Sequence, residues 1–329
     1  MNQPCSLVLS AVVLLGFVGV AHGTETAVHN DFDGDGRSDL LWRNRASGAL
    51  VYWPSADHAQ GVLVQINTPA GFPLSGMSVA GTGNYYDNAA RTNILLREDA
   101  TNDHYLLVHD YARGSGYVAS LSDFSFYMDA DSEVAGTGDF NNGTISDILV
   151  RNQRNGSNYV VWSESWDFDF RPISSVTNLA WEIKGVSDFD GDGGSDILWR
   201  NAVTGGNAIW RSANVQYPLR LARVSDLAWK IIAVADFDGD GHSDIFWRNT
   251  STGANAIWKS GSSATRQSVV GVTNQSWQVA AVGDFDGDGR ADLFWRNTGS
   301  GRNVIWKSAN ASTQQAVTQV GNQDWNVIP

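Results

Sequence analysis

Aspartates recur at a fixed spacing in four short segments of the sequence. Each segment reads Asp-Phe-Asp-Gly-Asp-Gly-x-(Ser/Ala)-Asp, which puts carboxylates at positions 1, 3, 5 and 9. Four carboxylates so close together repel one another unless a cation lies among them. Oxygen ligands in a loop that opens Asp-x-Asp-x-Asp-Gly suit Ca²⁺, whereas Zn²⁺ prefers nitrogen and sulfur. The pattern therefore predicts four Ca²⁺ sites, with the carboxylates of Asp31, Asp33, Asp35 and Asp39; Asp188, Asp190, Asp192 and Asp196; Asp236, Asp238, Asp240 and Asp244; and Asp284, Asp286, Asp288 and Asp292.

The other positions of these segments have predicted roles as well. A backbone carbonyl at position 7 is expected to complete each ligand shell, from Arg37, Gly194, His242 and Arg290. The phenylalanine at position 2 should turn away from the metal into the protein interior. A fifth site is left open at Asp139, Asn141 and Asp147, where Gly143 stands at position 5. A sixth copy, which begins at Asn84, has an extra residue and ends on Asn93, and it is predicted to bind no metal. We expect the metal to have a structural role.

The acidic segments mark an internal repeat that organises the chain. Three copies begin 48 residues apart, and the six units begin at Asp31, Asn84, Asp139, Asp188, Asp236 and Asp284. Within a unit, short runs rich in β-branched and aromatic residues alternate with glycine turns, which is typical of strands. The unit that starts at Asp188 predicts strands at residues 197–200, 207–210, 217–221 and 229–234.

The two ends of the repeat array complement each other. The chain ends on residues 323–329, which match the fourth strand of a unit but stop before another acidic segment. The N-terminal part supplies an acidic segment with little strand before it. The last strand would complete the first unit, so the fold class is an all-β closed β-propeller of four-stranded blades. Six blades are favoured, and seven remain open if residues 83–139 contain an extra blade.

The N-terminal segment, the cysteine count and the net charge indicate where the protein is located and which partners it has. Residues 7–20 are apolar and are followed by Ala21-His22-Gly23, so residues 1–23 are predicted to be a signal peptide and residues 24–329 the propeller. A retained membrane anchor is the alternative. We expect a secreted, extracellular protein, or a periplasmic one, without disulfides because Cys5 is the only cysteine. The net charge of −13 disfavours nucleic acid, and the mature chain has no membrane-spanning segment.

The motif resembles that of FG-GAP/VCBS repeat proteins, most clearly at residues 234–245, Val-Ala-Asp-Phe-Asp-Gly-Asp-Gly-His-Ser-Asp-Ile. The resemblance covers essentially the whole chain from Asn30. It implies a calcium-binding propeller, usually of seven blades, like the propeller of integrin α subunits or of fungal and bacterial lectins. It implies no single activity, because members adhere, bind glycans or accompany enzymes.

Repeated aromatic and basic residues offer two further predictions. Thirteen of the 14 tryptophans recur at strand positions, where the choice lies between packing within the propeller and stacking on a glycan. The predicted ligand-binding residues are those of the second strand beside a glycine turn, Trp210, Trp258 and Trp306. An arginine recurs in every unit, either to hold the scaffold or to form an anion-binding ring: Arg43, Arg97, Arg151, Arg200, Arg248 and Arg296.

Three functional hypotheses follow. The first is a secreted calcium-binding propeller that acts as a binding or adhesion module for glycans or a cell-surface partner. The second is a polysaccharide lyase or hydrolase centred on His104 and His109 in the divergent second unit, although the chain has no nucleophile elbow, zinc-protease or P-loop motif and no catalytic residue is assigned. The third is a purely structural interaction protein.

Overall fold

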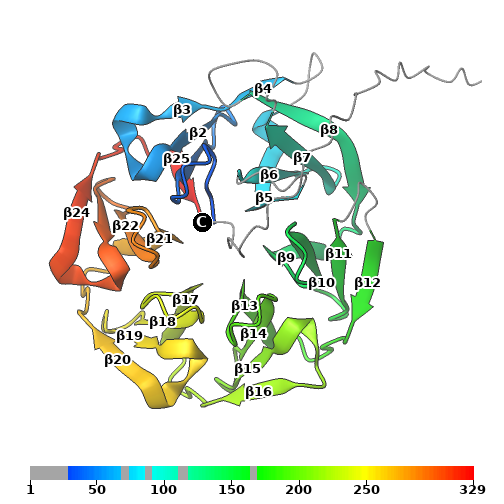
Figure 1. Cartoon of the computed structure of the whole chain (residues 1–329), viewed down its shortest axis with the longest axis vertical. Helices are drawn as coiled ribbons and strands as arrows, with labels where there is room; N and C mark the ends of the chain where they lie inside the picture. Colours follow the sequence, from blue (N-terminus) through cyan, green and yellow to red (C-terminus); the bar gives the residue numbers. More distant parts are fainter. Residues whose placement is uncertain (1–28, 68–73, 86–90, 110–117, 164–168) are drawn as a thin grey trace, which may run out of the picture.

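Six sheets, antiparallel except for one short outer strand, surround a central axis in this protein (Figure 1). The computed structural model describes residues 29–67, 74–85, 91–109, 118–163 and 169–329. Each sheet is one blade, and blades 1 to 6 follow the sequence around the ring. The predicted all-β propeller with six blades is confirmed.

The strands of each blade run outward from the axis in sequence order, except in blade 1. Blade 1 contains β25 (Trp325–Ile328), β1 (Leu40–Asn44), β2 (Leu50–Trp53) and β3 (Val62–Leu63); blade 2 contains β5 (Met77–Gly83), β6 (Asn93–Glu98), β7 (Asp103–His109) and β8 (Val118–Tyr127); blade 3 contains β9 (Ser132–Gly138), β10 (Asp147–Asn152), β11 (Asn158–Trp162) and β12 (Asp169–Ile173). Blade 4 contains β13 (Trp181–Ser187), β14 (Asp196–Asn201), β15 (Asn207–Trp210) and β16 (Pro218–Leu221); blade 5 contains β17 (Trp229–Ala235), β18 (Asp244–Asn249), β19 (Asn255–Trp258) and β20 (Arg266–Val269); blade 6 contains β21 (Trp277–Gly283), β22 (Asp292–Asn297), β23 (Asn303–Trp306) and β24 (Gln314–Val317).

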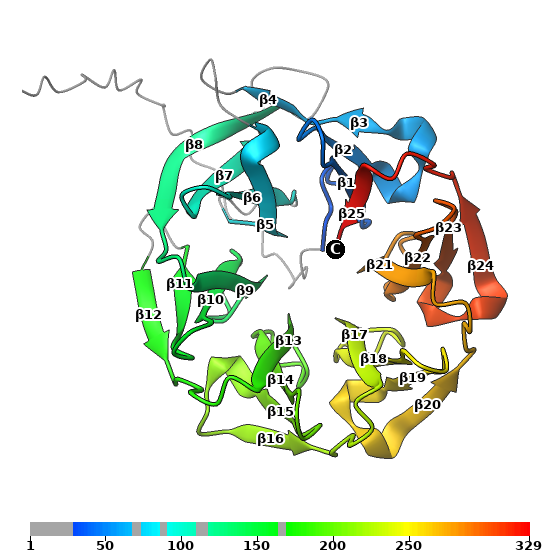
Figure 2. The same cartoon turned by 180° about the vertical axis from the view of Figure 1, so that it is seen from behind.

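The C-terminal strand closes the ring, as the sequence predicts. β25 pairs antiparallel with β1, with Leu41 opposite Ile328 and Asn44 opposite Trp325. The chain end therefore lies inside the ring beside the first blade (Figure 2). Closure joins the two ends of the sequence and gives β1 a paired strand on its inner side.

Blade 2 departs from the four-stranded pattern. A short strand from the connection between blades 1 and 2, β4 (Gln65–Asn67), adds to its outer strand β8 in parallel, so this sheet has five strands. This pairing was not predicted from the sequence, because three residues give no periodic signal.

Helical structure among the described residues is limited to single 3₁₀ turns. They are η1 (Pro54–Ala56), η2 (His58–Gln60), η3 (Leu74–Gly76), η6 (Arg211–Ala213), η7 (Lys259–Gly261), η8 (Ser263–Thr265), η9 (Lys307–Ala309) and η10 (Ala311–Thr313). Within the described ranges, no helix has the length and apolarity needed to cross a bilayer.

The core lies between neighbouring blades. The tryptophans of β1, β14, β18 and β22 are 1% exposed. Each packs its ring against the tryptophan of the following strand, at centroid distances of 4.7–4.9 Å. Phe294 of blade 6 meets Trp42 of blade 1 edge-on at 6.2 Å. Large aromatic side chains thus fill the wedges between blades.

The recurrent arginines join neighbouring blades through their guanidinium groups, which donate mainly to backbone carbonyls. Arg200 donates to Gly205 O, Asn207 Oδ1, Val224 O and Trp229 O, and its guanidinium lies 4.9 Å from the ring centroid of Trp247 in the next blade. The same pattern holds for Arg151, Arg248 and Arg296. The scaffold interpretation of these arginines is therefore confirmed, rather than an anion-binding ring. Arg97 differs, because it is partly exposed and pairs with Asp99 at 3.4 Å.

Candidate metal centres

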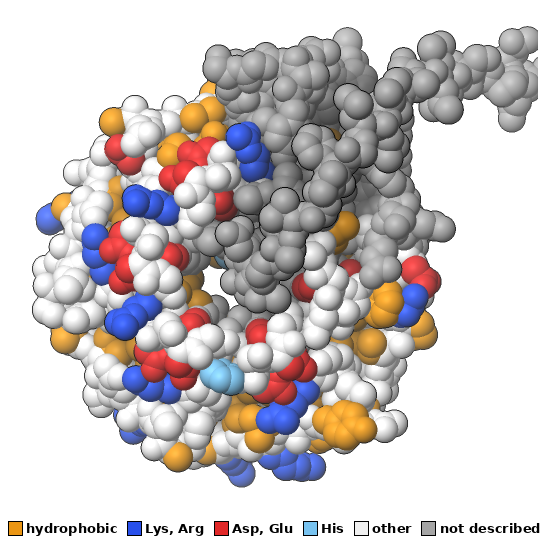
Figure 3. All heavy atoms as spheres, in the orientation of Figure 1, with side chains coloured by type: hydrophobic (Ala, Val, Ile, Leu, Met, Phe, Trp, Pro, Cys, Tyr) orange, Lys and Arg blue, Asp and Glu red, His pale blue; other side chains and the backbone are white. Residues whose placement is uncertain are grey.

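In blades 4, 5 and 6 the acidic segment connects the innermost strand to the next strand, and in blade 1 it leads directly into β1. We call residues 31–39, 188–196, 236–244 and 284–292 acidic loops 1, 4, 5 and 6, after their blades, and residues 84–93 and 139–147 the divergent loops 2 and 3. Acidic side chains gather in separate clusters around the central opening on one face, with Lys and Arg side chains beside them (Figure 3). The strands thus bring all four acidic loops to the same end of the propeller.

The carboxylate at position 1 organises its own loop. In acidic loop 6, Asp284 Oδ1 accepts the N–H of Gly287 at 2.7 Å, and Oδ2 accepts that of Gly289 at 2.8 Å. Both glycines have positive φ angles, which a side chain would strain. The same bonds recur in the other three acidic loops. The glycines therefore let the backbone curl around the first carboxylate.

The carboxylate at position 9 ties the loop to the next strand pair. Asp292 Oδ2 accepts the N–H of Phe285 at 3.1 Å, and Oδ1 accepts the N–H of Ser308 at 2.7 Å. Ser308 has a φ of 47°, an unfavourable value for a residue with a Cβ. Ser55, Ser212 and Ser260 share this strained conformation and donate to their position 9 carboxylates in the same way. A strained serine in each of these four blades indicates a functional constraint on that carboxylate.

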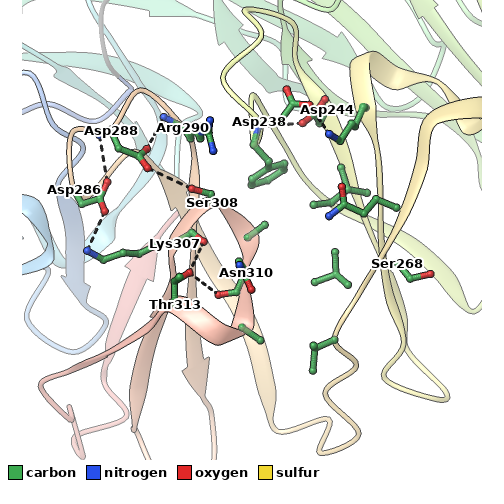
Figure 4. Close-up of a pocket in the computed structure, with 18 residues that line it drawn as sticks. Asp238, Asp244, Ser268, Asp286, Asp288, Arg290, Lys307, Ser308, Asn310 and Thr313 are labelled. Atoms are coloured by element: carbon green, nitrogen blue, oxygen red, sulfur yellow. Dashed lines mark hydrogen bonds and ion pairs between the residues drawn. The ribbon is translucent and has the colours of Figure 1, made fainter.

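The carboxylate at position 3 has a basic partner that the sequence analysis missed. Lys307 Nζ lies 2.9 Å from Asp286 Oδ2 (Figure 4), Lys259 Nζ lies 2.8 Å from Asp238 Oδ2, and Arg211 Nε lies 3.2 Å from Asp190 Oδ2. These bases follow the second-strand tryptophan in three units, so their repetition was the signal available. In blade 1 the residue after the tryptophan is Pro54, which carries no charge. Burial raises the pKa of Asp33 there, and the charge of Arg91 partly offsets this rise.

Three carboxylates converge in every acidic loop. Atoms within 4.8 Å of one another come from Asp31, Asp33 and Asp39; from Asp188, Asp190 and Asp196; from Asp236, Asp238 and Asp240; and from Asp284, Asp286 and Asp292. The fourth predicted carboxylate of each loop lies outside its group: Asp35, Asp192, Asp244 and Asp288. The full predicted ligand sets, with the carbonyls of Arg37, Gly194, His242 and Arg290, stay a prediction.

Two buried oxygens favour a cation at these centres. Oδ1 of Asp190 and Oδ1 of Asp238 are buried and accept no hydrogen bond from any described residue. Their other oxygens already hold Arg211 and Lys259. A buried carboxylate oxygen without a donor is unfavourable, and a hard cation among the converging carboxylates would satisfy it. The donor set, oxygen only, suits Ca²⁺.

The raised pKa values of the position 9 carboxyls also favour a cation in these loops. Burial, reinforced by the neighbouring aspartates, raises the pKa of the position 9 carboxyls: to about 8 for Asp39, about 6 for Asp196 and Asp244, and about 7 for Asp292. The hydrogen bonds from the serine and phenylalanine N–H groups oppose this rise. Without a counter-ion, the folded loop therefore resists full ionisation.

The divergent loops keep part of this arrangement. In loop 3, Asp147 Oδ2 accepts the N–H of Phe140 at 3.0 Å, and Asp139 Oδ1 accepts those of Asn141 and Gly143. The fifth site at Asp139, Asn141 and Asp147 stays a prediction. Residues 86–90 of loop 2 lie outside the described residues.

A belt of backbone hydrogen bonds links all six loops. The N–H at position 8 of each loop donates to the position 1 carbonyl of the preceding blade, over 2.5–2.8 Å. The pairs are Ser38 to Asp284, Thr92 to Asp31, Ser146 to Asn84, Ser195 to Asp139, Ser243 to Asp188 and Ala291 to Asp236. The divergent loops take part, so each loop contacts the two beside it, whether or not it carries a full set of carboxylates.

A pocket of about 590 Å³ lies between acidic loops 5 and 6 and the strands behind them. Asp238 and Asp244 of blade 5 lie on one side of it, and Asp286, Asp288 and Lys307 of blade 6 lie on the other (Figure 4). Its acidic lining belongs to the two metal centres.

The predicted ligand-binding tryptophans are largely enclosed. Trp210, Trp258 and Trp306 are 8%, 6% and 7% exposed, so little of each ring is open to a ligand. Their ligand-binding role stays a prediction. Trp210 also lines a second pocket, on blade 4.

The histidine site of the enzyme hypothesis has one described member. His104 is fully buried, its Nδ1 lies 2.9 Å from Asn102 O, and burial lowers its pKa to about 4. A buried imidazole does not reach a polysaccharide. The side chain of His109 and residues 110–113 lie outside the described residues, as do Trp166 and the predicted signal peptide.

Fold and loops together define a closed six-bladed β-propeller with an acidic loop on four blades. An FG-GAP-like repeat model matches residues 188–247 and 236–295, and an FG-GAP repeat model matches residues 276–316. The chain thus contains FG-GAP and FG-GAP-like repeats, consistent with the FG-GAP repeat family. No curated protein sequence matches the chain significantly.

Solved structures share the fold at low sequence identity. A crystal structure of a nidogen/laminin complex includes a chain that is 10% identical, with a TM-score of 0.54 over 88% of this chain and 95% of that one. A catalytically inactive variant of virginiamycin B lyase from Staphylococcus aureus, solved with quinupristin, is 8% identical, with a TM-score of 0.51 over 92% of this chain and 88% of that one. These likenesses concern the propeller fold alone.

Proposed function

We propose that this protein is a secreted, calcium-stabilised binding module that recognises a glycan or a cell-surface partner. The observation that carries the proposal is the convergence of three carboxylates in each of four loops on one face. The enzyme hypothesis is less well supported, because His104, the described member of its histidine pair, is fully buried.

Calcium would neutralise the carboxylates that now face one another. Asp236, Asp238 and Asp240 would hold it in acidic loop 5, and in the other three loops the carboxylates at positions 1, 3 and 9 would do so. Asp190 Oδ1 and Asp238 Oδ1 would gain the partner they lack. Since position 1 also accepts the belt hydrogen bond, an ordered loop would hold its neighbour in place.

The binding role rests on the class of fold. FG-GAP propellers serve as interaction modules, and the propeller in the nidogen/laminin complex supports a protein partner. The glycan alternative rests on the tryptophan-rich repeats and on the lectins that the motif resembles. Trp210, Trp258 and Trp306 are the residues we assign to it.

Binding to a glycan array and to intact cells, each with Ca²⁺ and with EDTA, tests the proposal. We expect binding that EDTA abolishes. Asp238→Asn should weaken it, whereas Asp169→Asn, which alters an exposed ion pair on blade 3, should not. Absence of binding to both surfaces would favour the purely structural interaction protein instead.

Secretion is proposed from the N-terminal sequence. If residues 1–23 are a signal peptide, the protein recovered outside the cytoplasm begins at Thr24. Mass spectrometry of the intact exported chain measures this directly. A chain that keeps residue 1 and stays with the membrane would support the anchor alternative.

A further inference from the structure

Blade 4 carries a second pocket, of about 440 Å³, which no metal centre accounts for. Its floor consists of buried or half-buried aromatic and aliphatic groups, including Trp181, Trp199 and Trp210. Its rim consists of exposed residues, including Pro218, Arg220 and Arg223. The pocket is thus an apolar hollow with a basic edge.

Strand register places the key side chains in one row. Trp199 of β14 lies opposite Ala208 of β15, which lies opposite Arg220 of β16. Side chains opposite one another in adjacent strands share a face of the sheet. The small Ala208 therefore leaves a hollow between the indole on one side and the guanidinium on the other.

Two features of this row belong to blade 4 alone among the described blades. The row ends in Arg220, whereas its equivalents are Leu63, Ser125, Pro172, Ser268 and Ala316. The turn before β15 has Gly206, where the others have Ala49, Asp103, Ser157, Ala254 and Arg302. A Cβ at Gly206 would lie 3.3 Å from Trp181 Cη2, so the glycine lets that indole fill the pocket wall.

The pocket has positive charge and an unused donor. Arg220 makes no hydrogen bond or ion pair with any residue that the structure describes, and Arg223 uses its Nε to donate to Thr204 O. The guanidinium of Arg151 lies 5.0 Å from the Trp199 ring centroid. Trp199 is 1% exposed, and its Nε1 has no acceptor among the described residues. No carboxylate lines the pocket.

We propose that this pocket binds an apolar carboxylic acid, with an aryl or branched alkyl group on the tryptophans and the carboxylate on Arg220. An arginine without a partner at the edge of an apolar hollow suits such a ligand. A sugar suits it less, because the only amide or hydroxyl side chain of the lining, Asn207, already donates to Gly205 O and Ala222 O and accepts from Arg200. The proposal does not rest on the metal centres or on the proposed glycan role.

Titration calorimetry in calcium-containing buffer tests the proposal with phenylacetate as the probe. Phenylacetamide keeps the ring and loses the charge, and galacturonate keeps the carboxylate and replaces the apolar group. The variants Arg220→Ser and Gly206→Ala give blade 4 the residues of blade 5, Ser268 and Ala254. Arg302→Ser removes an exposed arginine at the equivalent turn of blade 6 and is the control. Circular dichroism and melting curves verify that each variant is folded.

We expect phenylacetate to bind the wild type and Arg302→Ser equally. Arg220→Ser should weaken binding about tenfold or more, the loss of a charged hydrogen bond, and phenylacetamide should bind the wild type about as weakly. Gly206→Ala should weaken it as well. Equal binding of acid and amide, no effect of Arg220→Ser, no binding of phenylacetate to the wild type, or preferential binding of galacturonate would each overturn the proposal.

Discussion

At the scale of single residues, the position 3 aspartate has the most informative surroundings. Asp238 gives one oxygen to Lys259 and keeps the other buried without a donor. A cation bound in the loop would give that second oxygen a partner. The lysine then limits repulsion in the empty loop but leaves room for a metal.

Replacement of Asp238 by asparagine should remove one metal site. The side chain keeps its shape but loses its charge, so we expect the number of Ca²⁺ bound per chain to fall by one in titration calorimetry. Asp169→Asn should leave the number unchanged, because that carboxylate pairs with Arg171 on the surface. An unchanged number for Asp238→Asn would exclude this residue as a ligand.

The position 9 carboxyls predict an unusual pH dependence for the metal-free protein. Their pKa is raised in the folded state, to about 7 for Asp292 and about 8 for Asp39, so the folded chain binds protons that the unfolded chain releases. Their stabilising contribution is complete below about pH 4 and is lost as the pH rises through 6 to 8. Urea unfolding of metal-depleted protein at pH 5 and pH 8 measures the effect.

Calcium should remove this dependence, because it favours the ionised carboxylates. The metal-depleted protein should be less stable at pH 8 than at pH 5, and the calcium-loaded protein should not show that loss. Metal-free stability that rises between these two values would refute the assignment.

At the scale of strands and loops, an arginine in each of four blades holds the connection to the next blade. Arg200 joins the turn before β15, the strand β17 and the ring of Trp247. Charged donors to buried carbonyls are stronger than neutral ones, and the flat guanidinium both stacks and donates.

Arg200→Lys should therefore destabilise the protein although the charge is kept. A lysine cannot reach four acceptors or stack, and we expect a loss of about 2–3 kcal/mol in the free energy of unfolding. Arg154→Lys, at a side chain that is 80% exposed, should change it by less than about 0.5 kcal/mol. If both substitutions changed the free energy of unfolding equally, the contacts of Arg200 would not contribute to stability.

Most strand positions were predictable from the sequence. The second strand at residues 207–210 has the predicted bounds, and the fourth at 229–234 extends by one residue to Ala235. The partners of the loops were not predictable. Lys259 meets Asp238 although 20 residues of chain lie between them, and the belt bond from Ser243 to Asp188 joins different blades. Periodicity within a strand carries no information about such contacts.

Burial of the tryptophans was equally hidden in the sequence. The positions of Trp199 and Trp210 both recur from unit to unit, and both candidate roles, packing within the propeller and stacking on a glycan, require a large aromatic residue. Only the packing of β14 and β15 against the preceding blade, blade 3, decides that they are enclosed. The same applies to the blade 4 pocket, which depends on Gly206 and Arg220, two departures from the repeat.

At the scale of the whole molecule, stability depends on a closed ring. β25 fills the innermost place of blade 1, and Trp325 O accepts from Arg296 of blade 6. The last residues of the chain thus hold the first and last blades together.

Deletion of residues 325–329 should open the ring at this joint. β1 loses its inner partner and hydrophobic contacts of blade 1 become exposed, so we expect Tm to fall by more than about 5 °C and the radius of gyration to increase. Deletion of Pro329 alone, which lies beyond β25, should change neither. Scattering and melting curves that are the same for both deletions would argue against closure by β25.

The most direct test of the account is the melting temperature of the purified protein in excess Ca²⁺ and in EDTA. At free calcium ten times the Kd, each site adds roughly 1.4 kcal/mol of stability, so four sites should raise Tm by at least about 5 °C. Mg²⁺ at the same concentration should raise it less, because it demands a tighter octahedral shell. Equal melting temperatures with and without Ca²⁺ would contradict the claim that metal ions bound by the acidic loops stabilise this propeller.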